Sequence, residues 1–342
     1  MMEDLALLEK LCAARGVSGS EDEVRSRIRE EIEPFADHVE ETPLGNLIAF
    51  RKGKERAAVR LMLDAPMDEP GLIVTRVTEE GLLRIDTVGD VDPRVLPGKG
   101  VSFDSGLRGV IGVKPIHLLE KDEMEKSVPL KELYVDIGAE NRAEAERAVK
   151  PGDVCAFDSV FDASHGKVKG RAAGSRAACA LLVSLLREGL RYDATFVFSV
   201  QGEIGAGGAR TAAYAVDPQA ALAVGSVPAF DTAGGKGENR VCRLGGGAVV
   251  PFLDRRTAYD REYSRMAFEA ARAAGADCQA AESVAGANDA GAVHVSRGGV
   301  RTAAVALPCR YRRAPVEMIA QSDCDAAKKI IRALAERISG GN

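Results

Sequence analysis

Apolar and polar positions change period repeatedly in the second half of the chain. After residue 164, short apolar runs of strand length alternate with longer segments whose apolar residues recur at helical spacing. The predicted strands are ATFVFSVQ, AALAVGS and RTAAVALP, and the predicted helices are SRAACALLVSLLREGL, GGARTAAYAV, RTAYDREYSRMAFEAARAAG and DCDAAKKIIRALAERISG. Strands that alternate with helices predict an α/β fold with a mostly parallel sheet and helices on both faces.

The N-terminal third also combines predicted helices with a predicted buried strand. Ser20 and Glu23 stand at capping-box spacing and predict the start of a helix in GSEDEVRSRIREEIEPF. Residues 56–65, RAAVRLMLDA, predict a mostly buried strand. These elements fit as the first part of the same α/β domain.

The segment between these two parts has a different pattern. From residue 68 to 163, short β-prone stretches such as GLIVTRVT, LLRIDTV and GVIGV are separated by Gly, Pro and Asp turns. This pattern predicts a small all-β domain. The domain organisation that follows is a discontinuous α/β domain, residues 1–67 and 164–342, with a β-rich insertion at 68–163.

Composition narrows the class of protein. No run of about 18 apolar residues predicts a membrane span, and the N-terminus lacks the features of a signal peptide. The net charge of −5 gives no reason to expect a nucleic acid partner. Seven cysteines, none at C-x-x-C spacing, favour a reducing cytoplasm over a disulfide framework. The four histidines are few for a protein with a hydrolytic metal centre.

Candidate functional groups lie where the predicted strands end. In open α/β sheets, functional side chains gather at the carboxyl ends of strands and in the turns that follow. Four such segments stand out, and a fifth opens a helix: LDAPMDEPG (63–71), QGEIGAGGA (201–209), LAVGSVPAFDTAG (222–234), LPCRYRRAPVE (307–317) and GRAAGSRAACA (170–180).

These segments, in this order, resemble the glutamyl aminopeptidase family of dinuclear-zinc peptidases. Its members form tetrahedral assemblies and have often been labelled endoglucanases. The resemblance covers essentially the whole chain, and it includes TPLGNLIAF, RGVIGVKPIHLL and KPGDVCAFD. It implies an aminopeptidase fold, an inserted domain used for dimerisation, and a site for two zinc or cobalt ions. In such a site the metals polarise a carbonyl and generate hydroxide, while a glutamate acts as general base.

The positions that the resemblance assigns to chemistry carry different residues here. Two histidine ligands are replaced by Pro66 and Arg313, and two aspartate ligands by Gly174 and Gly225. Gly202 stands at the position of the general base. Of the assigned ligands only Glu203 remains, together with Asp68, which in the family orients the first histidine.

Proline and glycine side chains offer no donor atom, and a guanidinium group is a fixed cation. One glutamate cannot hold zinc, which needs about three to four protein ligands. We therefore expect no bound cofactor. We also expect Arg313 to reach into the emptied cavity and form a salt bridge with Glu203, since a buried, unpaired carboxylate is costly.

Replacement nucleophiles are not favoured. Cys179 lies on the apolar face of a predicted helix and has no histidine base in its sequence context. Ser175 lies outside any G-x-S-x-G elbow, so a serine hydrolase is not predicted.

Three functional hypotheses follow. The chain is a catalytically inactive homologue that acts as a structural or regulatory subunit, or it binds a peptide or small molecule, or it is an active metal-dependent aminopeptidase with atypical ligands. The resemblance implies an oligomer, formed by copies of this chain or together with an active paralogue. No nucleic acid or membrane partner is expected.

Overall fold

The fold is known from a computed structural model that describes residues 5–121, 124–232 and 240–341. Its centre is a mixed sheet with the strand order β1-β2-β11-β3-β12-β15-β13-β14. The four central strands, β11, β3, β12 and β15, run parallel to one another, which confirms the predicted α/β class. The strands of this sheet are β1 (His38–Glu41), β2 (Leu47–Arg51), β3 (Leu61–Pro66), β11 (Ala194–Ser199), β12 (Ala220–Pro228), β13 (Ala248–Val250), β14 (Cys278–Ala280) and β15 (Arg301–Cys309).

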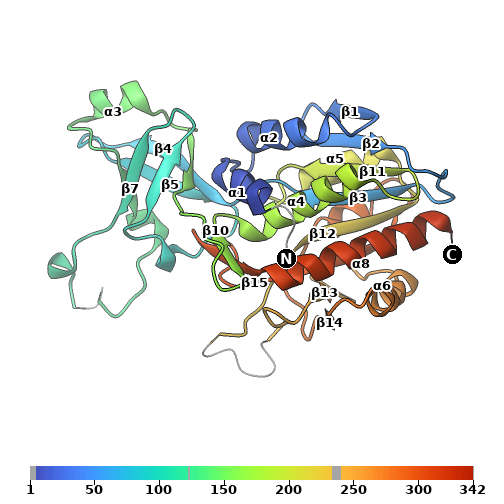
Figure 1. The fold of residues 1–342 in the computed structure, drawn as a ribbon. Coiled ribbons are helices and arrows are strands. Elements are labelled where there is room, and N and C mark those ends of the chain that lie inside the picture. The colour runs from blue at the N-terminus through green and yellow to red at the C-terminus, as the bar shows by residue number, and fades with distance from the viewer. Residues whose placement is uncertain (1–4, 122–123, 233–239, 342) are drawn as a thin grey trace.

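Helices cover both faces of the sheet (Figure 1). One face packs against the larger core, to which α1 (Leu5–Ala13), α2 (Asp22–Ile32), α4 (Ala173–Glu188), α6 (Arg261–Ala273) and α8 (Gln321–Gly340) contribute. The opposite face packs against α5 (Gly207–Val216) and α7 (Ala290–Val293) through a smaller core rich in alanine. Within the described residues, no helix has the length and apolar character needed to cross a membrane.

A closed barrel lies to one side of the sheet (Figure 1). Its strand order is β4-β5-β8-β7-β6-β9, and it has a hydrophobic core of its own that includes Leu72, Leu83 and Phe157. The barrel consists of β4 (Gly71–Val77), β5 (Leu83–Val88), β6 (Gly100–Phe103), β7 (Arg108–Gly112), β8 (Tyr134–Asp136) and β9 (Val154–Phe157), with α3 (Arg142–Ala148) beside it. Along the chain, the barrel is inserted between β3 and the strand that begins at Lys167. Its role in dimerisation stays a prediction.

Two local predictions are wrong. The strand expected at 56–65 begins only at Leu61, because the backbone N–H groups of Ala58 and Val59 donate to Ser339 O in α8 and not to a strand. The capping box is absent: α2 begins after Glu21, which makes no side-chain cap. Ser20 instead donates to Asp104, and Glu23 pairs with Arg15.

A buried ion cluster connects the sheet to the barrel. Glu69 lies in the link from β3 to β4, and its side chain is fully buried. Its carboxylate lies 2.9 Å from Arg171 Nε and 3.1 Å from Arg176 Nη2, and it also accepts a hydrogen bond from the backbone of Gly16. Each arginine also donates to a backbone carbonyl at the end of α1 or just after it. One carboxylate therefore joins three segments that are distant in the sequence.

Glu69→Ala should lower the free energy of unfolding by about 3–5 kcal/mol, because it leaves two buried guanidinium groups without their counter-charge. The measurement is chemical denaturation followed by circular dichroism. Glu55→Ala is the matched control, since Glu55 pairs with Arg191 on the surface, and this variant should unfold almost as the wild type does. Equal stability of both variants would contradict a structural role for the cluster.

Candidate functional site

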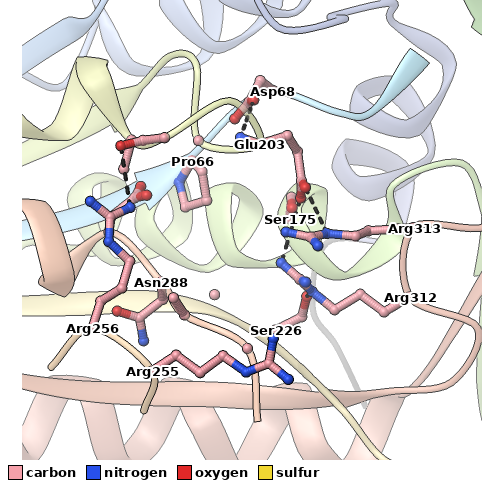
Figure 2. A pocket seen from close by; sticks show the side chains of 17 residues that line it. Pro66, Asp68, Ser175, Glu203, Ser226, Arg255, Arg256, Asn288, Arg312 and Arg313 are labelled. Atoms are coloured by element: carbon pink, nitrogen blue, oxygen red, sulfur yellow. Dashed lines mark hydrogen bonds and ion pairs between the residues drawn. The ribbon is translucent and has the colours of Figure 1, made fainter. Parts of the chain in front are cut away.

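The main candidate site is a pocket of about 370 Å³ at the carboxyl edge of the parallel strands (Figure 2). The neighbouring strands β11, β3, β12 and β15 each contribute residues to this edge. Pro66 ends β3, Gly202 and Glu203 follow β11, Gly225 lies in β12, and Arg313 follows β15. The parallel arrangement thus brings these five sequence-predicted positions to one pocket. Gly174, at the start of α4, lies beside it against Ser226.

Two arginines face the carboxylate of Glu203. Arg313 Nε lies 2.7 Å from Glu203 Oε2, and Arg312 Nη2 lies 3.5 Å from Glu203 Oε1. The side chain of Glu203 is only 9% exposed, so the two cations supply its charge balance in a poorly solvated place. The structure therefore places Arg313 and Glu203 together. The contribution of Arg312 was not predicted, although its position beside Arg313 in the sequence was a signal.

A short two-stranded sheet positions Arg313. It pairs β10 (Lys167–Gly170) with β16 (Glu317–Ala320). The buried carboxylate of Glu317 accepts hydrogen bonds from Arg313 N at 2.8 Å and from Gly174 N at 2.9 Å. Arg313 has a φ of 68°, a left-handed conformation that a side chain rarely adopts without such support. Through these two hydrogen bonds, Glu317 connects the backbone at Arg313 to the start of α4.

Asp68 is more than a turn residue at the end of a strand. It is buried, and its Oδ2 accepts hydrogen bonds from Ser18 and from Glu203 N, the latter at 2.9 Å. Burial and the nearby charge of Glu203 raise its pKa to about 7. Its other oxygen, Oδ1, has no hydrogen-bond partner among the described residues and faces Gly202. Asp68 therefore holds the backbone of Glu203 while one of its oxygens remains unpaired beside the pocket.

Sequence reasoning missed a second pair of buried carboxylates, Asp64 and Asp289. Asp64 lies within β3, and Asp289 lines the pocket just before α7 and accepts a hydrogen bond from Ser199 at 2.9 Å. Burial, followed by the charge of Asp289, raises the pKa of Asp64 well above its usual value. Burial therefore favours the protonated form of Asp64 over its charged form. An aspartate inside the apolar run LMLDA was the available sequence signal.

Asp289 is not a capping residue. Its position before α7 suggests an N-cap, but its side chain makes no cap hydrogen bond and points to Ser199. The neighbouring Asn288 accepts from Ala290 N instead. Cys179 is buried, its thiol donates to Pro66 O, and burial raises its pKa, so it is not an activated nucleophile; Ser175 lines the pocket.

The donor set does not fit a dinuclear metal site. Within residues 5–121, 124–232 and 240–341, no three His, Cys, Asp or Glu side chains come together as a metal site would require. Glu203, which the resemblance assigns as a ligand, already forms ion pairs with two guanidinium groups. Guanidinium groups repel cations and offer no lone pair.

The three glycines differ in the space around them. A Cβ at Gly174 would lie 2.6 Å from Ser226, and one at Gly202 would lie 2.8 Å from Asp68 Oδ1. A Cβ at Gly225 would meet no atom within 4 Å. Neighbouring side chains therefore occupy the space beside Gly174 and Gly202. Among the described residues, none occupies the space beside Gly225.

The chain is similar to known aminopeptidases in both sequence and fold. A family model described as M42 glutamyl aminopeptidase matches residues 45–330. A proposed aminopeptidase of Acetivibrio thermocellus is 36% identical over 327 residues, which cover 95% of this chain and 96% of the relative. The solved TET aminopeptidase of a marine-sediment Thaumarchaeota archaeon has a TM-score of 0.93 at 29% identity, over 98% of this chain and 97% of that one. The TET1 peptidase of Pyrococcus horikoshii has a TM-score of 0.86 at 33% identity, over 97% and 98% of the two chains.

Asp68→Asn should change the pH dependence of stability. A carboxyl group with a raised pKa in the folded state binds its proton more tightly there than in the unfolded chain, so its contribution to stability is lost as pH rises from about 4 to about 7. The asparagine variant lacks this loss. Its stability relative to the wild type should therefore increase over that range, by roughly 2–4 kcal/mol, and then level off.

The measurement is urea denaturation at a series of pH values. Asp86→Asn, at an exposed position of β5 in the barrel, is the control and should follow the wild-type pH profile. A difference between Asp68→Asn and the wild type that stays constant from pH 4 to pH 8 would refute the assignment.

Gly174→Ala and Gly225→Ala form a second matched pair. The alanine at 174 must displace Ser226 and should lower the free energy of unfolding by about 1–3 kcal/mol. The alanine at 225 enters open space and should leave stability nearly unchanged. Thermal unfolding of both variants tests this, and a large loss at 225 without one at 174 would contradict the described packing.

Proposed function

Because the chain belongs to the M42 glutamyl aminopeptidase family, we propose that it is a non-hydrolytic member that keeps the family fold and binds a small molecule or the end of a peptide. The binding site is the pocket at the carboxyl edge of the sheet. The observation that carries this proposal is the pair of arginines, Arg312 and Arg313, on the one remaining carboxylate ligand, Glu203.

Hydrolysis of a peptide bond needs an activated water and a group that accepts its proton. Position 202, which the resemblance assigns to the general base, is a glycine, and Asp68 lies so close that a side chain there would require rearrangement. A single ligand replacement would leave a weakened metal site. Here the glycines and the proline supply no metal-donor atoms, and the two arginines place fixed positive charge in the same space. These combined changes support a site that has been adapted to another use.

The pocket is suited to recognition of an anionic group. Its lining includes four arginines, Arg255, Arg256, Arg312 and Arg313, and these approach from two sides (Figure 2). Guanidinium groups bind carboxylates with paired, charge-assisted hydrogen bonds. A negatively charged part of a peptide or metabolite would therefore bind there.

Assembly is the second part of the proposal. The TET1 peptidase of Pyrococcus horikoshii can assemble into a tetrahedron or a large octahedral shell. The similarity of the two chains covers both the sheet and the barrel, so we expect copies of this chain to form a homo-oligomer. The alternative is a hetero-oligomer in which this chain is a regulatory subunit beside an active paralogue. Co-purification of that paralogue would identify it.

The test of the functional proposal combines metal analysis with activity. Protein purified and incubated with Zn²⁺ or Co²⁺ should retain well under one metal ion per chain after desalting, measured by mass spectrometry. It should not hydrolyse glutamyl or lysyl p-nitroanilide in the presence of either metal. The Pyrococcus horikoshii TET1 peptidase, treated in parallel, is the positive control. Two bound metals per chain with turnover would establish the active-aminopeptidase alternative with atypical ligands.

A further inference from the structure

A second cavity of about 370 Å³ adjoins the pocket. The two cavities share Arg255, Arg312 and Arg313, so the arginines lie at their junction. The second cavity is lined on its other side by Phe230 and Tyr311, whose side chains are 53% and 55% exposed. Two large, half-exposed aromatic side chains beside a cluster of cations form a surface with an apolar part and a charged part.

Arg255 lies at this junction and is exposed. Among the described residues, its side chain makes neither a hydrogen bond nor an ion pair, whereas Arg312 and Arg313 share the carboxylate of Glu203. Arg313 makes one more ion pair, to Asp90 at 2.7 Å, and the side chain of Asp90 is 86% exposed. The junction therefore carries positive charge that the protein itself does not balance.

The surrounding carboxylates limit how much negative charge a ligand can carry. In the first pocket, four arginines face the three carboxylates of Asp68, Glu203 and Asp289. A ligand with one negative charge matches Arg255, whose guanidinium group has no side-chain or backbone partner among the described residues. A doubly charged phosphate would bring its second charge close to these acids, where like charges repel.

The aromatic side of the second cavity is held in place before any ligand arrives. Asp231 and Arg310 form a two-point ion pair with contacts of 2.7 and 3.0 Å. These residues directly adjoin Phe230 and Tyr311 in the sequence. Both aromatic residues have a left-handed φ, 52° and 57°, a conformation that costs energy and persists only where neighbouring contacts enforce it. The ion pair thus ties together the two backbone segments that carry the aromatic residues of this cavity.

From these observations we infer that the junction binds a monocarboxylate that carries an apolar or aromatic group. The carboxylate contacts Arg255 and Arg312, and the apolar group lies in the second cavity against Phe230 and Tyr311. The C-terminal residue of a peptide, when it is large and apolar, is one such ligand. This inference rests on the proposed function, because it names the class of molecule that the pocket binds.

The experiment is isothermal titration calorimetry of the full chain with four probes. N-acetyl-L-phenylalanine carries both features. N-acetyl-L-phenylalaninamide lacks the carboxylate, acetate lacks the apolar group, and inorganic phosphate brings more charge without an apolar group. N-acetyl-L-phenylalanine should bind, and each of the other three probes should bind at least about tenfold more weakly, since each loses a charge-assisted contact or the burial of a ring.

Three variants localise the binding. Arg255→Gln and Tyr311→Ala change exposed side chains at the junction and in the second cavity, and each should weaken binding of N-acetyl-L-phenylalanine about tenfold. Arg265→Gln changes an exposed arginine on α6 that pairs with Glu269, and it should bind as the wild type does. Thermal unfolding of each variant confirms that the fold is intact.

The outcomes separate this inference from the proposed function. Equal binding of the acid and its amide, preferred binding of phosphate, or no binding of any probe would overturn the inference. Weakening by Arg256→Gln but not by Arg255→Gln would place the ligand in the first pocket alone, which also overturns it while leaving a binding function in place. Only stoichiometric metal with peptide hydrolysis would overturn the proposed function.

Discussion

The structure depends on one electrostatic constraint: a carboxylate removed from water needs a cation, hydrogen-bond donors or a proton to offset the lost solvation. Three buried acids meet this constraint in different ways. Glu69 is paired with Arg171 and Arg176, and Glu203 with Arg312 and Arg313. For Asp64, burial and a neighbouring carboxylate raise the pKa, which favours the protonated form. The first of these pairings connects the barrel to the sheet, and the second defines the pocket.

The two arginine pairings have different consequences because they differ in exposure. Around Glu69 the side chains are at most 8% exposed, so the cluster is closed to solvent and serves the fold. Around Glu203 the arginine side chains are 17% and 29% exposed, and a further arginine at the same junction has no partner among the described residues. The first cluster is closed to ligands, whereas the second still has hydrogen-bond donors to offer.

The family fold can persist when the residues at the site change, and the reason is physical. The positions of the strand ends follow from the apolar cores on the two faces of the sheet and from the register of its parallel strands. Pro66 and Gly225 take part in this register as backbone positions, opposite Ser199 and Ala306, and the register needs no metal-binding side chain at either position. Glycine, proline and arginine can therefore stand at the strand ends without loss of the fold, provided that the remaining carboxylates keep their counter-charge.

The sequence by itself determined the α/β class, the β-rich insertion and the place of the site at the strand ends, because these follow from local periodicity and from motifs that are continuous along the chain. It also pointed to Glu203 and Arg313, since both lie within such motifs. The roles of Arg312, Asp64 and Asp289 were decided only by the tertiary structure, as were the closed space at Gly174 and the open space at Gly225. Each of these depends on atoms from strands and loops that are far apart in the sequence. Burial and charge balance at such points are properties of the assembled sheet edge, and no single segment contains them.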